Sequence, residues 1–354
     1  MKIGYSGPFP PHPSGGAALS YWLLAGLAVK RSDMEVYGYS TTSKPIWAPG
    51  VKNPINPLEL NSMLFYYSCN ILKHFFPQLK GRVLLVAHHG FDNVVSTAEE
   101  LAKSLSDADV VIATDKWEKS IFEGAGLQNV VVVPYPTDTF IFVPKPKENP
   151  IEILYTGRLL VYKGIIQLLQ AVDHILGKEP NVRFRVHGYI DAKWNGCIDI
   201  AKELKSLLDK YPNRAIIEEG WTMPWDMPKV YEGAHIFVFP SGRASFGIPM
   251  AEAMSMEIPV VTTSYGSHGE VVGDAGIKLK PTVEVSVNHV YTDKTWTNLV
   301  PSADDIQDAL LNLVSNSELR EKLGKAGRER VKKLFDTSIV TDKLLEVINE
   351  NSPH

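Results

Sequence analysis

The sequence predicts an α/β protein with two domains, each built on a parallel β-sheet that is flanked by helices. The chain has 354 residues, about twice the length of a typical domain. Short apolar, β-branched runs alternate with segments of helical period, as expected for parallel sheets buried on both faces. A polar, proline-rich stretch at 144–150 interrupts this alternation once and indicates a linker.

Residues 1–143 are predicted to form a first Rossmann-like domain and residues 151–335 a second one. Ligands of such sheets bind beyond the carboxyl ends of the strands, so we expect two facing domains with a cleft between them. Strands are expected at 3–5, 36–39, 83–87, 110–113, 130–133, 152–155, 183–187, 215–218, 235–239 and 259–262.

Helices are expected at 17–28, 164–176, 304–315 and 317–334. A last helix, within 336–354, is predicted to cross back to the first domain. Residues 282–302 have no clear helical period and are predicted to be an excursion before the terminal helices.

Composition excludes several classes of function. The net charge of −4 disfavours nucleic-acid binding, because proteins that neutralise many phosphates are usually basic. Cys69 and Cys197 are the two cysteines, so neither a disulfide framework nor a zinc site is expected. No apolar stretch is long enough to span a membrane and no signal peptide is recognised, which predicts a cytoplasmic location.

A glycine pair follows the first predicted strand. Gly15 and Gly16 precede a helix, where exposed backbone N–H groups and the positive end of the helix dipole suit a phosphate. The alternative is an ordinary turn between a strand and a helix. There is no GxGxxG pattern, so dinucleotide binding is weakly supported.

Two cations follow the first strand of the second domain. Arg158 and Lys163 lie five residues apart, between a strand end and the glycine that opens a helix. An Arg fork and a Lys ammonium placed there can hold a diphosphate. The alternative is two solvated surface cations, and the flanking glycines favour the functional interpretation.

The segment 240–254 also follows a strand. Phe246, Gly247 and Ile248 lie where a loop becomes a helix, and their backbone can face a ligand. Glu252 falls in an apolar helical stretch, where a carboxylate needs a partner. A ribose diol would serve, and so would an internal Arg or Lys.

In their order and spacing, these motifs resemble the GT-B family of retaining glycosyltransferases called family 4, or glycosyl transferases group 1. This family includes relatives of sucrose and glycogen synthases. The matching segments are Gly15-Gly16, His88-His89, Val133–Asp138, Gly157–Gly164, Phe246–Met254, Ile258–Val261 and Gly269–Val272.

The resemblance implies a GT-B fold, with the acceptor side in the first domain and the nucleotide-sugar donor side in the second. It implies retaining transfer of a hexose from a nucleotide-diphosphate sugar to a hydroxyl of a glycan, a lipid-linked molecule or a small molecule. No metal or other cofactor is implied. The departing diphosphate would be stabilised by Arg158, Lys163 and a helix dipole.

The resemblance also implies roles for the remaining residues. Glu252 would hold the ribose, and the backbone of residues 246–248 would meet the sugar and phosphates. A histidine at the end of the strand 83–87, either His88 or His89, would contact the transferring sugar. The family usually carries a second glutamate eight residues before Glu252, where this chain has Ala244. Its loss puts donor choice and catalytic rate in question.

Two further segments have competing interpretations. Asp107-Ala108-Asp109 matches a DxD metal motif, but its place before an apolar run favours a turn at a helix end. Residues 61–76 are aromatic, and basic residues follow up to Arg82. A buried helix is one interpretation, and contact of 61–82 with a membrane carrying a lipid-linked acceptor is the other.

Three rival functions stay open. A GT-B epimerase or hydrolase would consume the nucleotide sugar without an acceptor. A weakly active or inactive nucleotide-sugar-binding protein is made more plausible by Ala244. A dehydrogenase is disfavoured by the missing glycine fingerprint.

Overall fold

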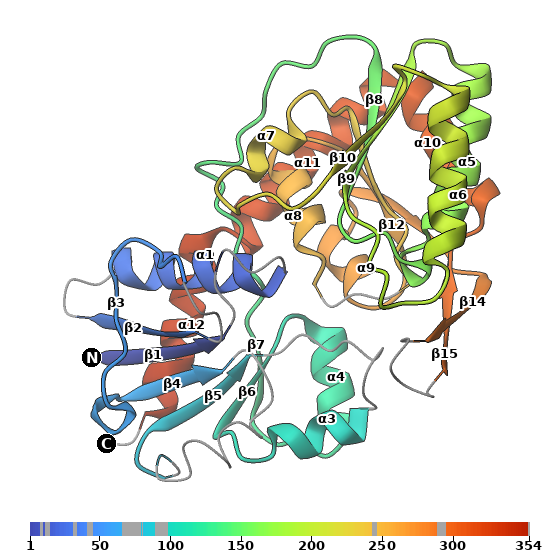
Figure 1. The fold of residues 1–354 in the computed structure, drawn as a ribbon. Helices are drawn as coiled ribbons and strands as arrows, with labels where there is room; N and C mark the ends of the chain where they lie inside the picture. Colours follow the sequence, from blue (N-terminus) through green and yellow to red (C-terminus); the bar gives the residue numbers. More distant parts are fainter. Residues whose placement is uncertain are drawn as a thin grey trace. The chain divides into compact units, whose positions relative to one another are not determined.

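The computed structural model describes residues 1–7, 10, 15–30, 34–40, 45–65, 79, 81–88, 98–242, 246–288 and 295–352 (Figure 1). It divides the chain into two compact units. The N-terminal unit contains residues 1–139, 223–225 and 333–354, and the C-terminal unit contains residues 140–222 and 226–332.

The N-terminal unit is built on a parallel sheet with the strand order β3-β2-β1-β4-β5-β6-β7. Two apolar clusters pack on its two faces: one joins the sheet to α1 and α12, and the other joins it to α3 and α4. The elements are β1 (Lys2–Gly7), α1 (Gly15–Lys30), β2 (Glu35–Ser40), β3 (Val51–Lys52), η1 (Pro57–Glu59), β4 (Ser62–Phe65), β5 (Leu84–His88), α3 (Ala98–Leu105), β6 (Val110–Ala113), α4 (Lys116–Gly124), β7 (Val130–Val132) and α12 (Thr337–Asn351).

The C-terminal unit has a second parallel sheet, with the order β10-β9-β8-β11-β12-β13. In Figure 1, α5, α6 and α10 lie together on one face of this sheet. Its elements are β8 (Ile151–Thr156), η3 (Val161–Lys163), α5 (Ile165–Lys178), β9 (Val182–Gly188), α6 (Cys197–Lys210), β10 (Ala215–Glu219), α7 (Met227–Tyr231), β11 (Ile236–Phe239), α8 (Ile248–Ser255), β12 (Val260–Thr263), α9 (Ser267–Val272), β13 (Gly276–Leu279), the antiparallel hairpin β14 (Val283–Asn288) and β15 (Thr295–Val300), α10 (Ala303–Ser315) and α11 (Ser317–Leu334).

This second order is that of a Rossmann sheet. The chain moves outward from β8 to β10, then returns to the other side of β8 and continues outward from β11 to β13. The order therefore reverses between β8 and β11, and ligands of open α/β sheets bind beyond the carboxyl ends of the strands at such a switch point. A ligand site is therefore expected at the loops that follow β8 and β11.

The structure confirms the predicted α/β class and all ten predicted strands to within about two residues. Strands β3, β4 and β13 were not predicted, and the predicted excursion contains the hairpin β14–β15. The buried-helix interpretation of 61–76 is wrong at its start, since Ser62–Phe65 is a strand that pairs with β1 and β5. The other residues of that segment lie outside those described, as do most of the basic residues proposed for membrane contact.

The DxD sequence is a turn, as predicted. It lies between α3 and β6, and Asp109 Oδ2 accepts a hydrogen bond of 2.8 Å from the backbone N–H of Leu85. One carboxylate of the motif therefore fixes the neighbouring strand. In the part of the chain that the structure describes, no helix combines the length and the apolar character needed to cross a membrane.

Candidate functional site

The loops after β8 and β11 are joined through their backbones. The N–H of Gly242 donates a hydrogen bond of 3.0 Å to the carbonyl oxygen of Tyr162. Gly164 has φ 71°, and a Cβ atom at this position would lie 2.6 Å from the carbonyl oxygen of Pro240. A side chain there would be both strained and blocked, so glycine is required for these loops to meet at the switch point.

Arg158 lies two residues beyond the end of β8. Its Nη1 forms a salt bridge of 3.2 Å with Asp191, and its Nη2 donates a hydrogen bond of 3.4 Å to the hydroxyl of Tyr162. The Arg158 side chain is 38% exposed, whereas Tyr162 is buried. The guanidinium is therefore held in place by its neighbours and still reaches the surface.

Lys163 lies on the other side of the same tyrosine. Its Nζ is 5.4 Å from the ring centroid of Tyr162 and 5.1 Å from that of Phe239, the last residue of β11. An ammonium group over two aromatic faces is attracted by both rings. Arg158 and Lys163 thus contact one residue, Tyr162, and the structure brings together the two cations that the sequence pairs.

His268 is a site residue that the sequence analysis missed. It lies in the first turn of α9 and is 1% exposed. Its ring is 5.4 Å from the ring of Phe239, centroid to centroid. Burial, and then the charge of Lys163, lower the pKa of His268 to about 3, so the imidazole is neutral at physiological pH. Among the described residues its Nε2 has no hydrogen-bond partner. In the sequence, only the position of His268 shortly after the predicted strand 259–262 could have indicated it.

The loop that follows β11 ends at Gly247, which begins α8 with φ 79°. A Cβ atom on Gly247 would lie 3.3 Å from Cδ2 of His268 and 2.5 Å from Cε of Met250, so a bare backbone is needed here. Phe246 is fully buried and Ile248 is the first helical residue. The N-terminus of α8, with its positive dipole end, therefore lies beside His268.

Glu252 lies in the second turn of α8 and is 4% exposed. The Tyr231 hydroxyl donates a hydrogen bond of 2.7 Å to its Oε2. The alternative to a ribose diol, an internal Arg or Lys, is not what the described residues show: the partner is a tyrosine. Burial raises the pKa of Glu252 to about 8, although the hydrogen bond from Tyr231 opposes this shift. Because burial disfavours the charged form, the carboxyl group is mainly protonated at neutral pH.

Other predicted residues belong to the N-terminal unit or lie outside the described part. Gly15 and Gly16 are the first two residues of α1, which follows β1 along the chain. His88 is the last residue of β5, and the position of its side chain is not described. His89 and Ala244 lie outside the described residues. Their roles stay predictions.

The two Rossmann-like sheets define a GT-B fold, and comparison with known structures agrees. HepE from Anabaena, solved in complex with UDP, has a TM-score of 0.73 over 99% of this chain and 100% of its own, at 16% identity. Sucrose-phosphate synthase from Thermosynechococcus elongatus has a TM-score of 0.74 over 99% and 98%, at 17% identity. At these identities the likeness concerns the fold.

The model of the family glycosyl transferases group 1 matches residues 136–330, more than half of the chain. The chain therefore belongs to this family and is a glycosyltransferase by family. That membership confirms the resemblance seen in the sequence motifs.

Two curated relatives align with part of this chain. The capsular polysaccharide glycosyltransferase CapM of Staphylococcus aureus is 29% identical over 55% of this chain and 45% of its own length. The O-antigen chain mannosyltransferase B of Escherichia coli is 26% identical over 60% and 59%. The chain spans about half the length of several curated relatives that it matches.

Proposed function

We propose that the protein is a retaining glycosyltransferase that moves a sugar from a nucleotide-diphosphate sugar to a hydroxyl acceptor. One observation carries the proposal: Arg158 and Lys163 flank Tyr162 at the switch point of the C-terminal sheet. A planar fork and a point charge at this place suit the two phosphates of a nucleoside diphosphate. Family membership supports a sugar as the group transferred.

In this proposal cationic groups of the protein, and no metal ion, stabilise the negative charge of the diphosphate. As the glycosidic bond breaks, negative charge develops on the departing diphosphate, and Arg158, Lys163 and the N-terminus of α8 stabilise it. The acceptor hydroxyl attacks from the face that the diphosphate leaves, and its proton passes to a phosphate oxygen. The reaction therefore requires no metal ion, and the anomeric configuration is retained.

Glu252 and the backbone at Gly247 take binding roles. We assign the ribose diol to Glu252, which would exchange part of its contact with Tyr231 for the ribose hydroxyls. The partly exposed backbone of Gly247 and the N–H of Ile248 are assigned to the sugar and phosphates, since Pro249 has no N–H and Met250 donates to the Gly247 carbonyl oxygen. Neutral His268 lies near Gly247 with an Nε2 that has no partner in the described part of the chain, and it adds no charge of its own.

The test is donor consumption with and without acceptors. UDP-glucose is the first donor to try, since a neighbour with this fold was solved in complex with UDP-glucose. Transfer to a hydroxyl acceptor with the anomeric configuration kept, and unaffected by EDTA, supports the proposal. Donor consumption without any acceptor favours an epimerase or hydrolase. Tight binding with no turnover on a panel of nucleotide sugars and acceptors favours a binding protein. The specific reason to consider a binding protein is that Ala244 replaces the usual family glutamate.

A further inference from the structure

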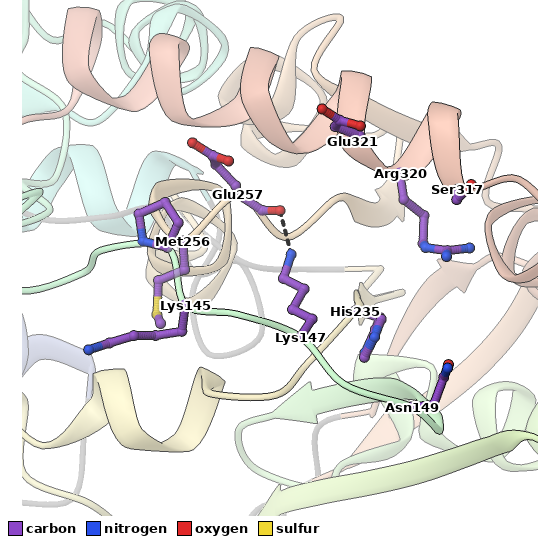
Figure 2. A pocket seen from close by; sticks show the side chains of 10 residues that line it. Lys145, Lys147, Asn149, His235, Met256, Glu257, Ser317, Arg320 and Glu321 are labelled. Atoms are coloured by element: carbon purple, nitrogen blue, oxygen red, sulfur yellow. Dashed lines mark hydrogen bonds between the residues drawn. The ribbon is translucent and has the colours of Figure 1, made fainter.

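A cavity lies within the C-terminal unit, at the end of the sheet opposite the cationic site. Its volume is about 430 Å³ (Figure 2). Asn149 lies just before β8 and His235 just before β11, so the cavity is at the amino ends of these strands. The turn after α8 and the first turn of α11 supply the rest of its wall.

Lys147 reaches into this cavity from the linker. Its Nζ donates a hydrogen bond of 2.7 Å to the backbone carbonyl oxygen of Glu257 (Figure 2). The side chain is half-buried, and among the described residues no carboxylate forms a salt bridge with it. Burial and the charge of Arg320 lower the pKa of Lys147 to about 8, although the Glu257 carboxylate opposes this. Lys147 is therefore a cation whose charge is incompletely balanced.

Arg320 points into the cavity from α11 (Figure 2). Its Nη1 donates hydrogen bonds of 2.5 Å and 2.9 Å to the carbonyl oxygens of Leu313 and Val314 at the end of α10. These bonds fix the guanidinium by one nitrogen. Within the described part of the chain, Arg320 forms no salt bridge with a carboxylate.

His235 is a third basic residue that lines the cavity. It is 9% exposed, and its Nδ1 lies 3.0 Å from the carbonyl oxygen of Gly233 and 3.2 Å from the backbone nitrogen of Glu152. The backbone therefore occupies one ring nitrogen and leaves Nε2 for the cavity. Burial, and then the charges of Lys147 and Arg320, lower the pKa of His235. The charges of Lys147 and Arg320 therefore both act on His235, and the charge of Arg320 also acts on Lys147.

The acidic side chains that line the cavity lie further from His235 than Lys147 and Arg320 do. Glu321 pairs with Lys325, which lies one turn further along α11. In Figure 2 the carboxylates of Glu257 and Glu321 lie apart from each other, and both lie further from His235 than the side-chain ends of Lys147 and Arg320 do. The end of the cavity nearest His235 is therefore its basic end.

We propose that the basic end of this cavity binds a small phosphoryl-bearing anion between Lys147, Arg320 and His235. An anion there would offset the repulsion among the basic groups and use the donors of Arg320 that its backbone contacts leave over. A phosphoryl group presents at least three acceptor oxygens. They match donors from Lys147, from Arg320 and from Nε2 of His235 in the tautomer whose Nδ1 accepts the Glu152 N–H. A carboxylate offers two oxygens and would leave one donor unused.

Equilibrium dialysis with radiolabelled inorganic phosphate at constant ionic strength tests this proposal. The full chain carries Arg158→Ala and Lys163→Ala, so that the cationic site at the other end of the sheet does not contribute. One saturable site per chain is expected. Lys147→Gln and Arg320→Gln should each weaken binding about tenfold or more, because each removes a charge-assisted hydrogen bond. Competition with glycerol 3-phosphate separates a phosphomonoester ligand from free phosphate, and glycerol is the uncharged comparison.

Lys145→Gln is the matched control. Lys145 also lines the cavity, but it pairs with Glu232 at 3.9 Å and is exposed, so its variant should bind phosphate within about twofold of the parent. Melting curves check that Arg320→Gln stays folded. Phosphate binding by Arg320→Lys, which keeps the positive charge, is a second measurement at that position. The proposal is overturned if the parent shows no saturable site, or if Lys147→Gln and Lys145→Gln bind alike. This outcome is independent of the proposed transferase activity.

Discussion

The ammonium group of Lys163 lies 5.1 Å from the ring centroid of Phe239, although 76 positions separate the two residues in the chain. Lys163 follows the loop after β8, and Phe239 ends β11. The contact therefore spans the place where the strand order reverses, and it fixes the cation at the carboxyl edge of the sheet. This is the relationship on which the proposed chemistry rests.

Replacing Lys163 with Ala should lower kcat at least about a hundredfold, because the charge that would stabilise the departing diphosphate is removed. Steady-state kinetics with the donor found active would measure the change. Lys178→Ala is the control. Lys178 is exposed at the end of α5, and the kcat of this variant should stay within about twofold of the parent value. A Lys163→Ala enzyme with near-normal kcat would exclude this residue from the mechanism.

Gly164→Ala should destabilise the chain more than Gly81→Ala does. The two glycines have φ 71° and 72°, so both substitutions carry the same backbone strain of about 1–2 kcal/mol. Only at Gly164 would the new Cβ meet a backbone oxygen, at 2.6 Å, whereas Gly81 has open space. Urea denaturation of the two variants should differ by about 2 kcal/mol or more. Equal losses would mean that the loops after β8 and β11 are not in contact.

Glu252→Gln should stabilise the ligand-free protein at high pH. The pKa of Glu252 is about 8 in the folded chain and 4.5 as its ordinary value, so folding favours the protonated form. The stability that this raised pKa contributes is fully present below 4.5 and is lost as pH rises through 8. Glutamine does not titrate, so its advantage should grow by up to about 1.4 kcal/mol per pH unit in this window. Thermal unfolding from pH 5 to 8.5 measures it, and a pH-independent difference between the proteins would contradict the assignment.

Restoring the family glutamate should raise activity. Ala244→Glu supplies the carboxylate that the resemblance assigns to the donor sugar, and we expect kcat/KM for the preferred donor to increase about tenfold. Ala244→Gln has similar size without the charge and should give a smaller gain. If the two variants behave alike, the missing carboxylate does not limit this enzyme.

His88 and His89 can be separated by kinetics. The resemblance places one of them against the transferring sugar, so one alanine variant should lose at least about tenfold in kcat/KM and the other less than threefold. Comparing the two with the same donor and acceptor decides which. Small losses in both would remove the strand end after β5 from the proposed site.

The sequence predicted most of the fold because buried parallel strands are continuous apolar runs. It failed where this signal is weak: β3 has two residues, and β4 stands at the start of a long aromatic segment that resembles a helix by composition. The hairpin β14–β15 was missed because its partly exposed strands were judged by helical period alone.

For the site, chain order alone located Arg158 and Lys163, since both follow a strand end and precede a glycine. Partners distant in the sequence could not be predicted in the same way. Tyr231 reaches Glu252 across 21 positions, and His268 reaches Lys163 only through the packing of α9 beside β11. Those contacts depend on the sheet order, which no local pattern encodes.

Helix α8 has eight residues and is therefore about 12 Å long. Gly247, just before its first residue, lies beside His268, while Met256 and Glu257, just past its end, line the cavity at the amino ends of the strands. One short helix of the C-terminal unit therefore borders both the proposed donor site and the proposed phosphoryl site.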